Sequence, residues 1–488
     1  MPADLTRGGG GIDQSNSNLA ESGSRTVNGP RIGGTVSRPA ADPPYRLSHR
    51  RASGPARHSP YCLWRTRRPA LPAVRPARRG TRRTVRRDAR HPARPGPLAA
   101  RGIAWSTGPV RRRTRTRARA APYADSAGGP HMSATPPAGQ GDEPGRIMSG
   151  EMAEQPAMLR RILEQGAPRI RETAAEIAAR KPRFVLLTAR GTSDNAALYA
   201  KYLLEIRLGL PCGLASMSTT TAYGAKPDLR DVLVVTVSQS GGSPDLVAST
   251  RAAREAGAVT LAVTNNPDSA LAAVSEFHID ILAGPEKALP ATKTYTASLL
   301  SLYLFVEGLG GRDGTEAAAG LPDLAGAVLG RRAEVKALAS RYRFAERMVI
   351  TSRGYGYPTA KEAALKLMET SYIPALSYSG ADLLHGPLAM VDNISPVIAV
   401  VTDGRGGEAL QPVLDRLRGR GADLFVVGPK AQVEAASAGF SLPTAGVPEE
   451  VQPILEILPL QLLAYEVTIA RGQDPDAPRA LAKVTETR

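Results

Sequence analysis

The sequence predicts an α/β protein with two tandem, doubly wound parallel-sheet domains of the flavodoxin-like type, preceded by a disordered N-terminal extension. Three observations lead to this prediction. The composition changes sharply near residue 147, short apolar runs alternate with helical stretches beyond that point, and the alternating pattern occurs twice. Strands that are apolar along their whole length, with helices between them, are typical of a parallel sheet covered on both faces.

Residues 1–147 form the predicted extension, which carries the whole of the chain's excess positive charge. They hold 28 arginines, no lysine and eight acidic residues, whereas the rest of the chain holds 35 basic and 37 acidic residues. The segment is rich in Pro, Gly and Ser, and it cannot bury enough apolar surface to offset the entropy lost on ordering. Two other interpretations stay open: its arginine runs could tether nucleic acid, or translation could begin at Met132 or Met148. We expect no nucleic-acid partner for the chain.

The first predicted domain spans residues 148–315. Its strands are PRFVLLTARG, DVLVVTVSQSGG, AVTLAVTNNP and FHIDILAG, and the helices between them include SDNAALYAKYLLEIRLG and SPDLVASTRAAREAGA. Each apolar run ends in small or polar residues, which is the pattern of strands that alternate with helices in a parallel sheet.

The second predicted domain spans residues 330–488 and repeats the first. VITSRGYGYPTAKEAALK (349–366) corresponds to VLLTARGTSDNAALYA (185–200), VIAVVTDGRGG (397–407) to VLVVTVSQSGG (232–242), and ADLFVVG (422–428) to VTLAVTN (259–265). This self-similarity indicates a duplicated unit. A long apolar helix at 451–470 and a polar tail complete the chain.

Composition excludes several classes of site. Cys62 and Cys212 are too few for a disulfide framework, and the six scattered histidines offer no cluster of zinc ligands. No run of about 18 apolar residues predicts a membrane span, and the first residues lack the apolar stretch of a secretory signal. We therefore expect a cytoplasmic protein with no membrane partner.

The motif SQSGGSPD (238–245) follows a strand and opens a helix, which is the setting of a phosphate-binding loop. Ser238, Gln239, Ser240 and Ser243 supply hydroxyl and amide donors, and the two glycines let the backbone close around an anion. The loop lacks the lysine that nucleoside-triphosphate loops carry. The alternative is a plain strand-to-helix turn in which Ser243 only caps the helix.

The motif RGTSDN (190–195) also joins a strand to a helix. Ligands of doubly wound sheets bind outside the carboxyl ends of the strands, which makes Thr192 and Ser193 candidates for hydrogen bonds to a sugar. Taken alone, Ser193 is an equally good helix N-cap.

Three further features could carry acid–base chemistry. In the predicted helix at 361–372, Glu362, Lys366 and Glu369 share one face, where a carboxylate near a buried lysine could act as a base. The alternative is a solvated face with a Glu–Lys pair. His385 and Lys483, taken alone, are more typical of a structural histidine and a solvated lysine near a chain end.

Together these segments resemble the sugar-isomerase (SIS) domain family over residues 150–488. The markers are GTS (191–193), SQSG (238–241), GPEKALPATKTYT (284–296), EAALKLMETSYI (362–373), HGPLAMVD (385–392) and PRALAKVT (478–485). Within that family the chain resembles the isomerase half of the glutamine–fructose-6-phosphate aminotransferases and the stand-alone glucosamine-6-phosphate deaminases.

The resemblance implies how a sugar phosphate would be held. The residues that match the family's phosphate loop are Ser238, Gln239, Ser240 and Ser243. Those that match its sugar contacts are Thr192, Ser193 and the backbone of Ala482.

The resemblance also implies the catalytic groups. Glu369 matches the carboxylate that moves a proton between C1 and C2, and Glu362 and Lys366 match its supporting helix face. His385 matches the ring-opening histidine that the neighbouring subunit supplies, which implies a homodimer with a composite active site. Lys483 matches the tail lysine that contacts the open-chain sugar.

Departures from the aminotransferase pattern point to the deaminases. The N-terminal third carries no glutaminase sequence that could free ammonia from glutamine. Gly242 replaces an acidic residue, Arg190 replaces a cysteine and Ala291 replaces a serine, while the tail has one residue fewer after Lys483.

The resemblance thus implies an isomerising deaminase that converts glucosamine 6-phosphate and water to fructose 6-phosphate and ammonia, with no metal, nucleotide or redox cofactor. Two alternatives lie within the family: a ketose–aldose isomerase, for example of tagatose 6-phosphate, and a fructosamine-phosphate deglycase. A sugar-phosphate sensor is the alternative of another class. Against the sensor, no helix-turn-helix region is evident in the sequence.

Overall fold

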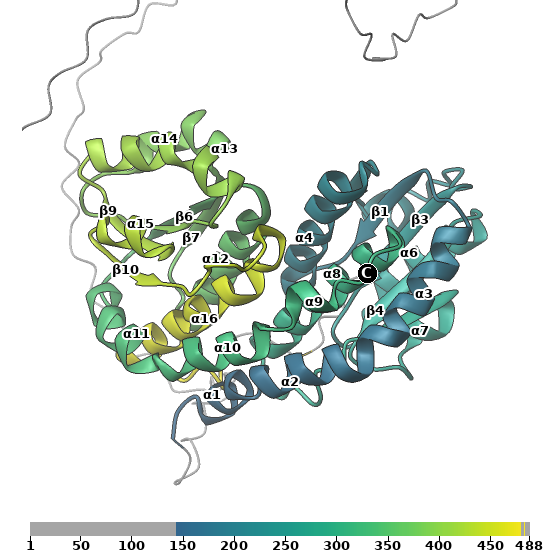
Figure 1. The fold of residues 1–488 in the computed structure, drawn as a ribbon, viewed down its shortest axis with the longest axis horizontal. Coiled ribbons are helices and arrows are strands. Elements are labelled where there is room, and N and C mark those ends of the chain that lie inside the picture. Colours follow the sequence, from purple (N-terminus) through teal and green to yellow (C-terminus); the bar gives the residue numbers. More distant parts are fainter. Residues whose placement is uncertain (1–142, 480–482, 484–488) are drawn as a thin grey trace, which may run out of the picture. The chain divides into compact units, whose positions relative to one another are not determined.

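The computed structural model describes residues 143–479 and Lys483 (Figure 1). The arginine-rich extension up to residue 142, and Ala482 near the other end, lie outside the described residues. Helix α1 (Arg146–Ala153) begins within the last residues assigned to the extension. Its first turn is held by the carboxylate of Asp476, which accepts hydrogen bonds from the backbone N–H groups of Ile147 and Met148.

The first half of the described chain contains a five-stranded parallel sheet in the order β2-β1-β3-β4-β5. Its strands are β1 (Phe184–Thr188), β2 (Cys212–Leu214), β3 (Val232–Val237), β4 (Val259–Thr264) and β5 (Phe277–Asp280). Four of them are the apolar runs read from the sequence. The edge strand β2 has only three residues, and its Cys-Gly-Leu sequence gives no apolar run that could predict it.

The second half contains another five-stranded parallel sheet, in the order β10-β9-β8-β6-β7. Its strands are β6 (Met348–Ser352), β7 (Ala375–Ser379), β8 (Pro396–Val400), β9 (Asp423–Gly428) and β10 (Ala438–Ser441). In each sheet the chain's second strand lies outside the first, and the third, fourth and fifth follow on the other side. This is the flavodoxin-like order, and it confirms both the predicted fold class and the internal duplication.

Helices cover both sheets and join them. Those of the first half are α2 (Gln155–Arg161), α3 (Ala167–Ala179), α4 (Gly191–Leu208), α5 (Ser218–Thr221), α6 (Pro244–Glu255), α7 (Ala270–Val274) and α8 (Lys293–Leu309). The connection is made by α9 (Thr315–Ala318), α10 (Leu321–Gly330) and α11 (Arg332–Ala339). The second half adds α12 (Tyr357–Ser371), α13 (Gly380–Leu384), α14 (Arg405–Gly419), α15 (Lys430–Glu434) and α16 (Pro453–Ala470).

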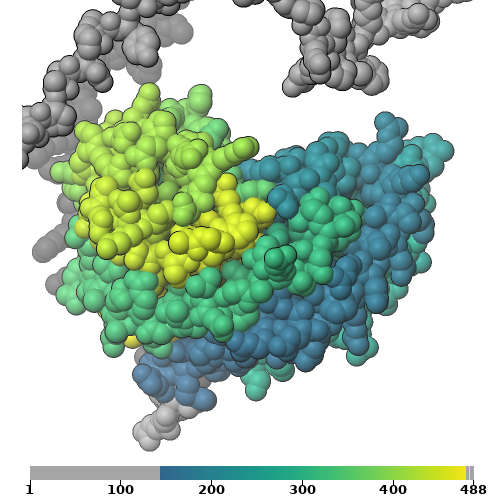
Figure 2. Space-filling view, viewed as in Figure 1, coloured from purple at the N-terminus to yellow at the C-terminus, as the bar shows by residue number. Residues whose placement is uncertain are grey.

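The two halves meet along helices that carry motif residues. Helix α12 of the second half packs against α4 of the first half and against α16. Figure 2 shows side chains filling the space between the two halves, with the yellow-green second half directly against the blue and teal first half. A side chain on α12 can therefore contact a side chain on α4, although the two helices are far apart in sequence.

Helix α16 is buried along nearly its whole length in the main hydrophobic core. Of the described helices, it alone, with the turn before it, is long and apolar enough to cross a membrane, and 89% of that window is buried inside the protein. A helix that is apolar all round and enclosed by other elements is the expected form of a core helix.

One acidic side chain lies within this helix. Glu456 is fully buried, and neither of its carboxylate oxygens has a hydrogen-bond partner among the described residues. Burial, together with the charge of Glu449, raises its pKa to about 8 from an ordinary value of 4.5. The folded protein therefore keeps Glu456 protonated at a pH where the unfolded chain has lost the proton.

We predict that Glu456→Gln stabilises the protein increasingly as pH rises from 5 to 8. Glu456 ionises above about pH 4.5 in the unfolded chain but only above about pH 8 in the folded protein. Between these pH values ionisation stabilises the unfolded state alone, so the free energy of unfolding falls as pH rises. Glutamine removes this penalty, so the difference in melting temperature between variant and wild type should grow across this interval. Thermal unfolding at pH 5 and pH 8 measures it, with Glu434→Gln on the exposed face of α15 as the control. A difference that is the same at both pH values would contradict the prediction.

Candidate active site

A cavity of about 350 Å³ lies at the carboxyl ends of β1 and β3, where the strand order of the first sheet reverses. Ligands of doubly wound sheets bind at this point. The residues that line the cavity are Arg190, Gly191, Ser193, Val237, Ser238, Gln239, Ser240, Ser243, Leu246 and Lys483. A hollow of about 430 Å³ beside α6 has a mainly apolar lining and holds none of the predicted site residues.

The loop between β3 and α6 forms one wall of this cavity. The hydroxyl of Ser238 accepts a hydrogen bond from the backbone N–H of Gly241 at 3.2 Å, which closes the loop on itself. Gly241 has a φ of 62°, and a Cβ there would collide with Ser269, so the tight turn requires glycine. Ser243 is the N-cap residue of α6 but makes no capping hydrogen bond with its side chain. Ser243 thus has the N-cap position that the alternative expected, but its hydroxyl does not cap the helix, and the residue lines the cavity.

The loop between β1 and α4 forms the facing wall. Arg190 occupies the N-cap position of α4, which places Ser193 in the first turn and not at the cap. The alternative role of Ser193 as an N-cap is wrong, and Ser193 lines the cavity. The neighbouring Thr192 turns toward α12, where its hydroxyl donates to Glu362 Oε1 at 3.0 Å and accepts from Lys366 Nζ at 3.1 Å.

The acidic and basic residues of α12 form a buried ion network. Glu362 and Lys366 are both 0% exposed, with 3.3 Å between Glu362 Oε1 and Lys366 Nζ. Lys366 also donates to the carboxylate of Glu369, whose side chain is 23% exposed. The alternative of a solvated helix face is thus wrong. The face is covered because α4 of the other half packs on it.

Asn195 completes this network and was not singled out from the sequence. Its side-chain amide donates to Glu362 Oε2 at 2.8 Å, and it is buried on α4. The available signal was its position three residues after Thr192, which places both side chains on one face of the helix. Each oxygen of Glu362 thus has a partner from the first half of the chain.

Burial and neighbouring charges shift the pKa values of Glu362 and Lys366 in opposite directions. Burial raises the pKa of Glu362, and the ammonium of Lys366 opposes that rise. Burial alone would lower the pKa of Lys366, but the charges of Glu369 and Glu362 outweigh it and hold the pKa above its ordinary value. Lys366 therefore stays charged, and it fixes the partly exposed carboxylate of Glu369 in one position. A positioned carboxylate of this kind suits proton transfer.

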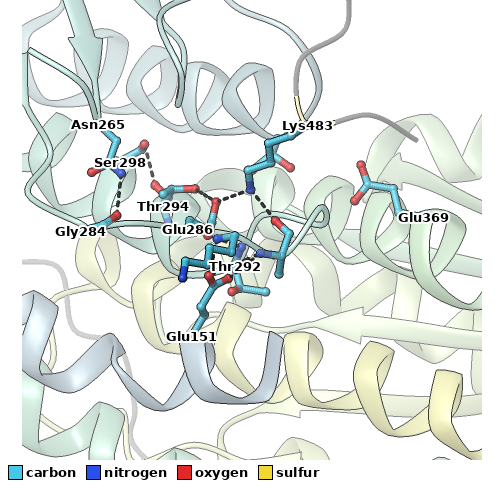
Figure 3. A network of polar contacts seen from close by, with 12 residues as sticks. Glu151, Asn265, Gly284, Glu286, Thr292, Thr294, Ser298, Glu369 and Lys483 are labelled. Carbon is cyan, nitrogen blue, oxygen red and sulfur yellow. Dashed lines mark hydrogen bonds and ion pairs between the residues drawn. The ribbon is translucent and has the colours of Figure 1, made fainter. Parts of the chain in front are cut away.

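Lys483 enters the site from the C-terminal tail. Its ammonium donates to Glu286 Oε2 at 3.4 Å and to the backbone oxygen of Ala288. Figure 3 shows these contacts, with Glu369 to one side of Lys483 and no contact drawn between them. Glu286 also accepts hydrogen bonds from Thr292 and Thr294.

The loop that receives Lys483 is itself held from behind. The buried carboxylate of Glu151, on α1, accepts hydrogen bonds from the backbone N–H groups of Lys287 and Ala288. Glu286 and Glu151 thus fix the same short segment from two directions, and this segment is where the tail lysine docks.

We predict that Glu286→Gln lowers turnover about tenfold while the protein stays folded. The charge-assisted hydrogen bond to Lys483 is roughly twice as strong as a neutral one, and glutamine removes the charge. Initial rates and melting temperatures of the wild type, Glu286→Gln, Lys483→Met and the double variant measure the effect. If Glu286 acts through Lys483, the double variant is no slower than Lys483→Met alone. A wild-type rate in Glu286→Gln would contradict the prediction.

Several predicted site residues do not line the cavity. Thr192, Lys366 and Glu369 lie in the ion network between α4 and α12 instead. His385 follows α13 on the surface, and its Nδ1 lies 2.7 Å from the backbone oxygen of Ala381. It is not among the residues that line the cavity. Ala482 lies outside the described residues.

The described residues offer neither a metal site nor a reactive thiol. Residues 143–479 and Lys483 contain no group of three or more His, Cys, Asp or Glu side chains that could hold a metal ion. Cys212 is buried, and burial raises its pKa to about 12. A thiol with that pKa is a poor nucleophile near neutral pH.

The chain has clear similarity to known proteins. The family model described as "SIS domain" matches residues 179–308 and 342–471. Glutamine–fructose-6-phosphate aminotransferase (isomerizing) of Pseudomonas putida is 35% identical over 356 residues, which cover 69% of this chain and 58% of that protein. The chain thus spans less than two thirds of the length of that relative.

Two solved structures share the fold and the two-domain arrangement. A proposed phosphosugar isomerase from Silicibacter pomeroyi is 32% identical with a TM-score of 0.62, and the match covers 67% of this chain and 99% of that one. The C-terminal domain of glucosamine-fructose-6-phosphate aminotransferase from Francisella tularensis is 28% identical with a TM-score of 0.61, covering 67% of this chain and 97% of that one. Each similarity spans nearly the whole of the solved chain.

Proposed function

Because this chain belongs to the SIS domain family and carries two such domains in tandem, we propose that it is a sugar-phosphate isomerase that releases ammonia from an amino-sugar phosphate. The proposed substrate is glucosamine 6-phosphate, and the products are fructose 6-phosphate and ammonia. The observation that carries this proposal is the buried network of Glu362, Lys366 and Glu369, which Thr192 joins to the segment of Gly191 and Ser193 that lines the cavity. That arrangement connects a fixed carboxylate to the wall of a site for a phosphate group.

The proposed reaction proceeds by proton transfer. The open-chain substrate has an aldehyde at C1 and an amine at C2. Glu369 removes the proton from C2, and the electron pair shifts to the C1 oxygen, which takes up a proton to give an enol with the amine at C2. The proton is returned at C1 while the nitrogen gives up one proton, which leaves a hydroxyl at C1 and an imine at C2. Water adds to the imine, and ammonia leaves as fructose 6-phosphate forms. The substrate's own carbonyl accepts the electron pair, so the reaction as written uses no metal, nucleotide or redox cofactor.

The remaining residues bind and orient the substrate in this proposal. The serines and Gln239 of the β3–α6 loop hold the phosphate, which fixes C1 and C2 relative to Glu369 with binding energy from a remote group. Ser193 contacts the sugar from the facing wall, and Thr192 contacts it beside Lys366. Lys483 and the backbone of Ala482 close over the open chain from the tail.

We propose that His385 acts in the site of a second copy of the chain. Its exposed position, away from the cavity of its own chain, supports this proposal. In a homodimer with composite sites, His385 of each copy would open the pyranose ring in the other. A cytoplasmic location is part of the same proposal, because its substrate would be an intracellular sugar phosphate.

The test is the release of ammonia from glucosamine 6-phosphate by the full chain, with fructose 6-phosphate measured in parallel. We expect both products in equal amounts, and neither from the Glu369→Gln variant. Absence of ammonia from a protein that binds the sugar phosphate would overturn the deaminase proposal. Interconversion of a ketose phosphate and an aldose phosphate would then favour an isomerase. Release of an amino acid from a fructosamine phosphate would favour a deglycase. Binding of the sugar phosphate without any reaction would favour a sensor.

A further inference from the structure

Arg190 places a cation on the wall of the candidate phosphate cavity. It lies between β1 and α4, on the wall that faces the loop of Ser238, Ser240 and Ser243, and it lines the same cavity as these serines. Its side chain is 54% exposed. The loop itself offers only neutral donors, and the cationic side chains that line the cavity are Arg190 and Lys483, of which Lys483 is bound to Glu286 and Ala288.

Asp245 holds the guanidinium of Arg190 in place. Arg190 Nε and Nη2 donate to the same oxygen, Asp245 Oδ2, at 3.1 and 2.9 Å. Asp245 is buried in the first turn of α6, so this anchor is rigid. A guanidinium has five N–H donors, and these two hydrogen bonds leave the other three for a further acceptor.

Asp245 does not need Arg190 in order to be buried there. Its other oxygen accepts the backbone N–H of Leu246 at 2.9 Å, and it sits at the positive end of a twelve-residue helix. The arginine, by contrast, is a long exposed side chain with many available rotamers. The ion pair therefore does more to orient Arg190 than to stabilise Asp245.

The second half of the chain offers an internal comparison. Arg353 follows β6 as Arg190 follows β1, with nearly the same backbone conformation, φ −144° against −138°. The second residue of α6 is Asp245 and the second residue of α14 is Gly406, and among the described residues no carboxylate forms an ion pair with Arg353. Arg353 lines a different hollow, on the second sheet. The anchored arginine thus occurs only in the half that carries the serine loop, within the described residues.

We propose that Arg190, oriented by Asp245, binds the phosphate group of the substrate and selects for phosphate monoesters in their dianionic form. The identity of the substrate in this inference rests on the proposed function, whereas the anion site rests on the geometry of Arg190 and Asp245. A charge-assisted hydrogen bond to a phosphate oxygen would use the donors that Asp245 leaves free. Arg190 is then a binding residue, and Asp245 is a positioning residue that acts through it.

The test measures binding of inorganic phosphate to the full chain by titration calorimetry, independently of turnover. Loss of a hydrogen bond to a charged group is expected to weaken binding of phosphate to Arg190→Gln by about tenfold to a hundredfold. Arg190→Lys should recover part of that loss, and Asp245→Asn should lose less than Arg190→Gln. Arg353→Gln is the matched control and should bind phosphate as the wild type does.

The pH dependence adds a readout that general unfolding would not produce. The second pKa of a phosphate monoester is about 6, so wild-type affinity for a sugar phosphate should fall as pH drops from 7.5 to 5.5. The fall in affinity should be smaller in Arg190→Gln, because this variant lacks the positive charge that favours the dianionic phosphate over the monoanionic one. In turnover assays KM should rise far more than the turnover number falls.

The outcomes separate this inference from the proposed function. Wild-type affinity for phosphate in Arg190→Gln, or an equal loss in Arg353→Gln, would overturn the role of Arg190 whatever the reaction is. A strong effect in a protein that releases no ammonia would uphold Arg190 and overturn the deaminase proposal. Failure of the wild type to bind phosphate at all would overturn both.

Discussion

Replacing Glu369 by glutamine is expected to reduce turnover by about 10²–10⁴-fold, the range that a positioned general base supplies. The substitution keeps the shape of the side chain and its place beside Lys366, but it removes the group that accepts the proton. Binding of inorganic phosphate should be unchanged, because the phosphate loop lies between β3 and α6 while Glu369 lies on α12 and does not line the cavity. Initial rates of ammonia release and calorimetric phosphate binding measure the two effects separately.

The control is Glu205→Gln, which removes an exposed carboxylate of a surface ion pair on α4. Surface pairs contribute little, so this variant should keep wild-type rate and stability. A rate in Glu369→Gln above one tenth of wild type would show that another group moves the proton. A loss of phosphate binding in the same variant would show that Glu369 shapes the cavity rather than the chemistry.

The central strands of both sheets could be predicted because each is an apolar run buried on both faces. The edge strands β2, β7 and β10 could not. Cys212–Leu214 has three residues, and Ala375–Ser379 and Ala438–Ser441 are mixed sequences with serine or glycine, so neither length nor pattern separates them from loops. These strands form because a neighbouring strand presents free backbone N–H and C=O groups. That neighbour is distant in sequence, so the residues of the edge strand do not themselves indicate the pairing.

The candidate site shows the same division between local and tertiary information. Helical spacing alone predicts that Glu362, Lys366 and Glu369 share a face. It does not say whether this face is exposed to water or covered by α4. An exposed face would carry only a solvated Glu–Lys pair, whereas the covered face holds a buried network that fixes Glu369. The role of Ser193 depended on where α4 begins, and its N-cap is Arg190, three residues earlier. The role of Ser243 depended on whether the hydroxyl of an N-cap residue bonds the helix, which sequence patterns do not resolve. Asn195 was missed because its partner, Glu362, is distant in sequence.

Replacing Lys366 by methionine is expected to abolish turnover and to lower the free energy of unfolding by about 3–5 kcal/mol at pH 7, the range measured when one partner of a buried ion pair is removed. Lys366 is fully buried between Glu362 and Glu369, and methionine of similar length removes the cation that both carboxyl groups contact. Urea unfolding followed by circular dichroism measures the stability.

The pH dependence follows from the raised pKa of Glu362. In Lys366→Met the ammonium that opposes that rise is gone, and only the hydrogen bonds from Asn195 and Thr192 still lower the pKa of Glu362. The folded variant therefore holds a proton on Glu362 that the unfolded chain releases above about pH 4.5. The stability deficit should therefore grow from pH 5 to pH 8. Because the deficit comes from keeping the buried carboxyl of Glu362 protonated, adding Glu362→Gln to Lys366→Met should restore most of the stability. It should restore none of the turnover, since Glu369 still lacks its fixed partner. Lys366→Met with wild-type stability at pH 8 would show that the network does not carry its charges in the folded protein.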